Sequence, residues 1–268
     1  MTPAPAPAPD APPRIRPSFA VAVGVWIAYM VVAVGVQASS GIAYADWFKT
    51  AANAWRTGVL SLAAGSALLA AFLVVARWDH LWREPVRLTT TRLMKTALIL
   101  WWAAIFLRFA GVRWNEVPLD LLAAIVATGV LVGFAEEILF RGIVLRGLRE
   151  GGRSEAVAVV WTSVCFGLLH LPNLFMGTGW IGIVQIVAAT ASGALLYAFR
   201  RATGVLWPAM VAHGAWDIST FVAGGYAAPW LEFAALPSLI LFPVLGFAVL
   251  GSVWRNDRGT AVIPATAG

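Results

Sequence analysis

The sequence has few charged residues and a single cysteine, and each scarcity excludes a class of protein. Asp, Glu, Lys and Arg make up 12% of the 268 residues, while 60% are hydrophobic. Soluble domains carry about 25% charged residues, so a bilayer rather than water is the expected solvent for most of this chain. The lone Cys165 excludes an intrachain disulfide and any metal site built from several cysteines.

Eight apolar stretches come close to the roughly 20 residues that a helix needs to cross a bilayer. They predict an all-α, polytopic transmembrane helix bundle that forms one domain, residues 18–254. The predicted spans are Ser18–Val36, Gly58–Ala76, Lys95–Ala110, Leu119–Arg141, Glu155–Leu171, Trp180–Phe199, Val205–Val222 and Phe233–Val253. Lys95 and Arg108 bracket the short third span and are expected to extend outward toward the membrane surface.

Both ends of the chain are predicted to be cytoplasmic tails. Residues 1–17 are rich in Pro and Ala and are expected to be disordered, and residues 255–268 form the second tail. With the N-terminus inside, all but four of the 19 basic residues fall on the cytoplasmic side, the exceptions being Lys49, Arg56, Arg108 and Arg113. This bias is typical of multi-pass membrane proteins. Arginine far outnumbers lysine, which indicates a GC-rich bacterial genome and hence a bacterial plasma membrane. No basic soluble segment is present to bind nucleic acid.

Two adjacent carboxylates, Glu136 and Glu137, lie inside the fourth span. A charged side chain at the bilayer centre costs roughly 3 kcal/mol on insertion scales. Both groups therefore need partners, protonation or a water-filled cavity. Glu137 lies four residues before Arg141, the spacing of a helical salt bridge. Because neighbouring residues point about 100° apart on a helix, Glu136 is free to face something else.

Later spans place two histidines and an aspartate at similar depth. A short turn joins the fourth and fifth spans, so these are expected to be antiparallel neighbours, with His170 level with Glu136. His213 and Asp217 lie at i and i+4, on one face of the seventh span. The pair could be a private hydrogen bond that holds two helices together, or part of a site.

Ionisable groups from three spans that point into one bundle indicate a functional site. A carboxylate beside a neutral histidine can polarise a water for attack on a carbonyl, while His213 and its neighbour stabilise the oxyanion. Alternatively, Glu136, His170 and His213 could hold zinc with one position open for water. His-Glu-x-x-His and Gly-x-Ser-x-Gly are absent, and Asp217 is the one aspartate well inside a span. Zincin-type, serine and paired-aspartate mechanisms are therefore disfavoured.

Three successive motifs resemble those of the CPBP family, the CAAX proteases and bacteriocin-processing enzymes also called the Abi family. Type II CAAX prenyl endopeptidases are among its members. The resemblance covers about a third of the chain, from about Val130 to Phe221. The motifs are Glu136-Glu137-x-x-x-Arg141, Phe166-x-x-x-His170-Leu171-Pro172-Asn173 and His213-x-x-x-Asp217.

The resemblance implies an intramembrane endopeptidase that cleaves a membrane-associated peptide or protein, with a catalytic core at about residues 119–222. Glu136 and His170 would activate the water, and His213 and Asp217 would line the oxyanion side. The supporting residues would be Glu137, Arg141, Phe166 and Asn173. The cofactor would be none or zinc, with a metal-free glutamate mechanism preferred. The alternatives are a non-enzymatic immunity or scaffold protein that uses the same polar cluster to join helices, and a transporter with a Glu/His proton relay.

Overall fold

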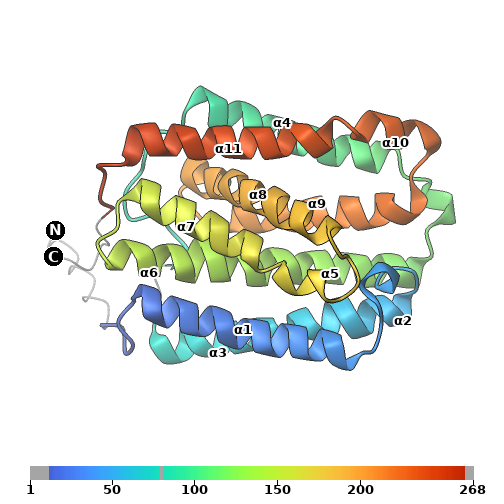
Figure 1. The fold of residues 1–268 in the computed structure, drawn as a ribbon, viewed down its shortest axis with the longest axis horizontal. Helices are drawn as coiled ribbons and strands as arrows, with labels where there is room; N and C mark the ends of the chain where they lie inside the picture. Colours follow the sequence, from blue (N-terminus) through green and yellow to red (C-terminus); the bar gives the residue numbers. More distant parts are fainter. Residues whose placement is uncertain (1–11, 79–80, 263–268) are drawn as a thin grey trace, which may run out of the picture.

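The computed structural model describes residues 12–78 and 81–262, which form a bundle of helices (Figure 1). No strand occurs in these residues, so the all-α prediction is confirmed. The main helices are α1 (Phe19–Ser39), α2 (Ala51–Ala54), α3 (Leu60–Ala76), α4 (Arg92–Ala110), α5 (Leu119–Glu137), α6 (Leu145–Glu150), α7 (Glu155–Leu168), α8 (Ile181–Thr203), α9 (Trp207–Tyr226), α10 (Pro229–Ala235) and α11 (Ser238–Asp257). Short 3-10 segments occur at Tyr44–Asp46, Trp114–Glu116 and Leu171–Leu174, and π-helical segments occur at Trp55–Val59 and Ile138–Val144.

Seven helical segments of the described chain are long and apolar enough to cross a membrane. They are Phe19–Ser39, Ala51–Ala76, Arg92–Ala110, Leu119–Glu150, Glu155–Leu174, Ile181–Thr203 and Pro229–Asp257. The remaining predicted span, Val205–Val222, corresponds to α9, which is a helix of 20 residues but does not reach that level of apolarity. Polar residues such as His213 and Asp217 lower its mean hydropathy. It packs against α5, α4 and α8.

In Figure 1, α5 runs through the middle of the bundle, with α1 and α3 on one side and α4 and α11 on the other. Helix α1 begins and α11 ends at the same end of the bundle. If all eight long helices cross the bilayer, the start of α1 and the end of α11 therefore lie on one side. That this side is the cytoplasm remains a prediction from the charge bias.

The fourth span continues beyond its predicted end at Arg141. Helix α5 runs without a break through the π-helical segment Ile138–Val144 into α6, which ends at Glu150. The prediction was wrong because it read a basic residue as a sign of the membrane surface. Arg141 is instead completely buried, with Glu137 as its partner. The short turn after Glu150 does join antiparallel neighbours, as predicted, since α6 contacts α7.

Close packing of α5 against α9 depends on glycine. A Cβ added to Gly133 would lie 2.3 Å from the Met210 carbonyl oxygen, and one added to Gly214 would lie 2.6 Å from the Gly129 carbonyl oxygen. Small residues at such crossings let two helix backbones approach closely. The approach sets the last turn of α5, with its two glutamates, directly beside His213 of α9.

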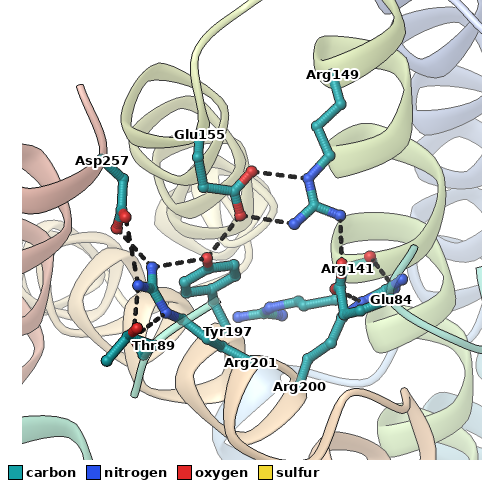
Figure 2. Close-up of polar contacts among 9 residues, drawn as sticks. All are labelled: Glu84, Thr89, Arg141, Arg149, Glu155, Tyr197, Arg200, Arg201 and Asp257. Atoms are coloured by element: carbon teal, nitrogen blue, oxygen red, sulfur yellow. Dashed lines mark hydrogen bonds and ion pairs between the residues drawn. The ribbon is translucent and has the colours of Figure 1, made fainter. Parts of the chain in front are cut away.

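Buried ion pairs tie the helices together at one end of the bundle (Figure 2). The guanidinium of Arg149 in α6 binds both carboxylate oxygens of Glu155 in α7, at 2.6 and 2.8 Å, and Glu84 at 2.7 Å. Glu84 lies in the connector between α3 and α4 and also pairs with Arg200 of α8. Bidentate pairs of this kind are the strongest hydrogen bonds in proteins.

The same network reaches the C-terminal helix. Arg201 of α8 donates to Asp257 of α11 at 2.6 Å and to the Thr89 carbonyl of the connector, also at 2.6 Å (Figure 2). Tyr197 donates to Glu155 at 2.6 Å. The connector between α3 and α4 is therefore fixed to α6, α8 and, through Arg201, α11.

Most of the predicted N-terminal tail, residues 1–11, and the last part of the C-terminal tail, residues 263–268, lie outside the described residues. The remainder of each tail contacts the bundle. The Trp78 indole donates to the Ile15 carbonyl at 2.8 Å, and the Glu155 amide donates to the Thr260 carbonyl at 2.8 Å.

Candidate active site

Glu137 is the centre of a buried hydrogen-bonded group that joins α5, α8 and α9. Its Oε1 atom accepts from Arg141 Nη1 at 2.8 Å and from His213 Nδ1 at 2.8 Å. Arg141 Nη2 also donates to the Gly193 carbonyl of α8 at 2.9 Å. The predicted Glu137–Arg141 salt bridge is present, and the side chains of both residues are fully buried.

Nε2 of His213 faces two other carboxylates. It lies 3.9 Å from Glu136 Oε2 and 3.9 Å from Asp217 Oδ2. Both distances exceed that of a direct hydrogen bond, so Nε2 of His213 is not paired directly with either carboxylate. The private His213–Asp217 hydrogen bond considered from the sequence is absent, because Glu137 on another helix orients the imidazole instead.

His170 lies just beyond the end of α7, and its imidazole is held by local contacts. Its Nδ1 donates to the Phe166 carbonyl at 3.2 Å. Because a carbonyl oxygen only accepts, this bond places the proton on Nδ1 and leaves Nε2 as a hydrogen-bond acceptor. The Phe166 ring packs edge-on against the rings of His170 and His213, with centroids 5.7 and 5.5 Å apart. Phe166 thus sets the spacing of the two histidines.

Most of the predicted site residues line one cavity of about 420 Å³. The four predicted catalytic side chains, Glu136, His170, His213 and Asp217, all line it. Two of the predicted supporting residues line it as well, Phe166 and Asn173. The other two, Glu137 and Arg141, lie behind this wall and hold His213. The arrangement therefore separates the residues that can touch a substrate from those that orient them.

Two lining residues, Tyr44 and Gln185, were missed by the sequence analysis. Asn173 donates to Gln185 at 3.0 Å, and Gln185 donates to the Tyr44 hydroxyl at 3.2 Å. Burial raises the pKa of Tyr44, the Gln185 hydrogen bond lowers it, and the charges of Asp217 and Glu136 raise it further, with a net increase. Its hydroxyl therefore stays protonated beside the cavity. No local sequence pattern links residues 141 positions apart.

Arg108 also differs from its predicted position. It does not extend away from the bundle but lines the cavity, with its guanidinium carbon 3.9 Å from the centroid of the Trp216 ring. The sequence analysis considered only the membrane–water interface as a place where this charge could be stabilised. An indole face inside the bundle also stabilises a cation, because its electron density attracts positive charge.

The zinc alternative does not fit this arrangement. Within residues 12–78 and 81–262, no three His, Cys, Asp or Glu side chains are grouped so that they could hold a metal ion.

These features describe a multi-pass helical membrane protein with a buried acid–histidine cavity. A family model described as type II CAAX prenyl endopeptidase Rce1-like matches residues 118–219. The matched segment contains every residue predicted for the site, and it confirms the predicted resemblance to the CAAX proteases. It supports a peptidase at the level of class and a bilayer as its environment. No curated protein and no solved structure matches the chain.

Proposed function

We propose that the protein is an intramembrane endopeptidase that hydrolyses a peptide bond of a membrane-associated peptide or protein. The observation that supports this most directly is the shared cavity, in which a carboxylate and two imidazoles converge among apolar helices. A bilayer offers no water for such groups, so their grouping around a cavity of about 420 Å³ favours chemistry over packing. A bacterial plasma membrane remains the predicted location.

The water would be activated between Glu136 and His170. His170 presents an unprotonated Nε2 because its Nδ1–H is bound to Phe166. Glu136 supplies a second acceptor in the same cavity. As one of them accepts a proton from the water, the oxygen attacks the carbonyl carbon of the peptide, and the same proton then goes to the departing amine. The reaction consumes one water and uses no metal.

The oxyanion would form on the opposite side, at His213. Glu137 fixes the Nδ1–H bond, so Nε2 is the atom turned toward the cavity. A doubly protonated His213 can donate from Nε2 to the developing negative charge, and the Glu137 carboxylate stabilises that cation. Asp217, 3.9 Å from the same nitrogen, would orient the ring or donate when protonated. Arg141 holds the Glu137 carboxylate in place.

The test compares membrane fractions from host cells that express the wild-type protein or Glu136→Gln at matched abundance. N-terminal peptide mapping is expected to show new N-termini that disappear in the variant. Glu116→Gln, a change at an exposed ion pair with Arg113, is the matched control and should retain them. Identical maps from wild type and a folded Glu136→Gln protein would reject the peptidase and leave the immunity or scaffold alternative.

A further inference from the structure

The cavity contains one cationic side chain that the proposed chemistry does not use. Arg108 comes from the last turn of α4, yet it lines the same cavity as Glu136 and His213. Among the residues that line this cavity in the described chain, it is the one Lys or Arg. A guanidinium cannot lose its charge in a protein, so it has to be stabilised where it lies.

The flat face of the Arg108 guanidinium is stacked on a protein ring, whereas its edge remains available to a ligand. Arg108 lies 3.9 Å over the Trp216 ring, and Trp216 stacks on Trp101 with centroids 4.1 Å apart. The Trp101 indole in turn donates to the Ala212 carbonyl at 3.0 Å. Stacking leaves the in-plane N–H groups of an arginine available, and they point outward in a fork that matches a carboxylate. The aromatic pair thus presents the edge of Arg108 in a defined position.

The guanidinium of Arg108 forms no direct hydrogen bond or ion pair within the described chain. Nη1 of Arg108 is buried and has no hydrogen-bond partner in the described chain. The charge of Asp217, which follows Trp216 in α9, acts on Arg108 from a distance, but Asp217 lies nearer His213 and forms no direct ion pair with Arg108. A buried donor without a partner costs roughly 1–3 kcal/mol, and more when it is charged. Because Arg108 lines the cavity without an ion pair of its own, its remaining N–H groups are most simply explained as donors to an anionic group of the substrate.

We propose that Arg108 is a specificity residue that binds a carboxylate of the peptide substrate, on the Trp216 side of the cavity. This rests on the proposed peptidase function, because it assigns a substrate feature to the same cavity. The carboxylate is either the free C-terminus of the peptide or an acidic side chain near the cleaved bond. Both present the same two oxygen atoms to the guanidinium edge.

The experiment measures binding without turnover, in full-length protein carrying Glu136→Gln in detergent micelles. The probes are N-dansyl-leucine and its amide, which differ only in the carboxylate, and dansyl fluorescence reports saturation. The acid is expected to bind about tenfold more tightly than the amide, as a charge-assisted pair predicts. Adding Arg108→Gln should reduce this ratio to about one. Arg113→Gln, which removes an exposed arginine three residues beyond α4, should leave the ratio unchanged.

Arg108→Lys is the second variant, because it keeps the charge inside the cavity but removes the planar fork, and it is expected to lose most of the preference. Competition by apolar peptides with a free C-terminus, or by amidated peptides carrying one Glu, then distinguishes the two carboxylate sources. Equal binding of acid and amide, no saturable binding of either, or a preference that survives both Arg108 variants would overturn the proposal. Because binding is read in an inactive protein, a failure of the peptidase proposal alone would leave these ratios intact.

Discussion

Two polar clusters lie in this bundle, and they differ in how completely the protein satisfies them. At the charged end, Arg149, Arg200 and Arg201 each bind a carboxylate directly, and the contacts of Arg149 are short, at 2.6–2.8 Å. In the cavity, Glu136 and Asp217 stand 3.9 Å from His213. Direct pairing stabilises a fold, whereas loosely spaced groups keep positions open for substrate and water. The first cluster is thus suited to structure and the second to chemistry.

The largest difference between the two clusters is expected when one carboxylate of the cavity is neutralised. Glu136→Gln is expected to lower the rate of peptide cleavage by roughly 10²–10⁴-fold, the usual contribution of a general base. Its thermal unfolding should change little, because no direct hydrogen bond of the Glu136 side chain is lost. A cleavage assay on purified protein, with unfolding in the same detergent, tests both statements. A stable variant with wild-type turnover would contradict the role given to Glu136.

The reverse behaviour is expected at the charged end. Arg149→Met leaves the buried Glu155 and Glu84 without their shared partner, and breaking such a pair costs roughly 3–5 kcal/mol. Arg113→Met, at an exposed pair, should cost about 1 kcal/mol or less. Chemical unfolding monitored by tryptophan fluorescence would measure both. The cleavage rate per folded molecule of Arg149→Met should stay near the wild-type value. A loss of turnover in folded Arg149→Met protein would contradict the assignment of a purely structural role to the charged end.

A glycine change where α5 crosses α9 should affect stability and chemistry together. Gly133→Ala sets a methyl group 2.3 Å from the Met210 carbonyl oxygen and forces α5 away from α9. Overpacking of this kind costs roughly 1–3 kcal/mol, and it also separates Glu137 from His213. Gly24→Ala in α1 meets no atom within 4 Å and is the matched control. It should be neutral or slightly stabilising. Equal cleavage rates in the two variants would count against the importance of the close approach.

The smallest expected effect is on the stability of the protein at acid pH. Burial by itself raises the pKa of Glu84, but the ion pairs with Arg200 and Arg149 outweigh it and hold this pKa below the ordinary value of 4.5. A lowered folded pKa means that the carboxylate stabilises the fold above 4.5, and that this contribution disappears as pH falls through the folded value. Unfolding free energy measured from pH 7 downward should therefore fall less steeply in Glu84→Gln than in wild type. Parallel curves would show that other carboxylates govern acid sensitivity.

Local sequence patterns sufficed for much of the fold and for part of the site. The apolar runs located all eight long helices to within a few residues at most ends, because burial in a bilayer demands length and apolarity. The Glu137–Arg141 pair followed from i, i+4 spacing alone. Helix starts such as Ser18 and Thr91, whose side chains accept from the amides of Val21 and Met94, are also local features.

Long-range contacts escaped prediction, and they change the interpretation of individual residues. Arg141 was taken as the end of a span, but in the structure it is a buried partner of Glu137. Arg108 was expected at the membrane surface, yet an indole on α9 holds it inside. In both cases helix packing adds a contact that buries the charge, namely the Gly193 carbonyl of α8 for Arg141 and the Trp216 indole of α9 for Arg108. The sequence shows which residues are charged, but not which residues of other helices lie close to them.

The sequence by itself therefore determined a helical membrane bundle, the identity of the acid and histidine side chains in the site, and the Glu137–Arg141 ion pair, which forms within one helix. Only the tertiary structure decided that Glu137 rather than Asp217 orients His213, that one cavity unites the four side chains, and that Arg108 turns into it. The reason is physical. Helix periodicity and bilayer solvation act within one segment, whereas the α5–α9 approach depends on glycines that are far apart in the chain and meet only after folding.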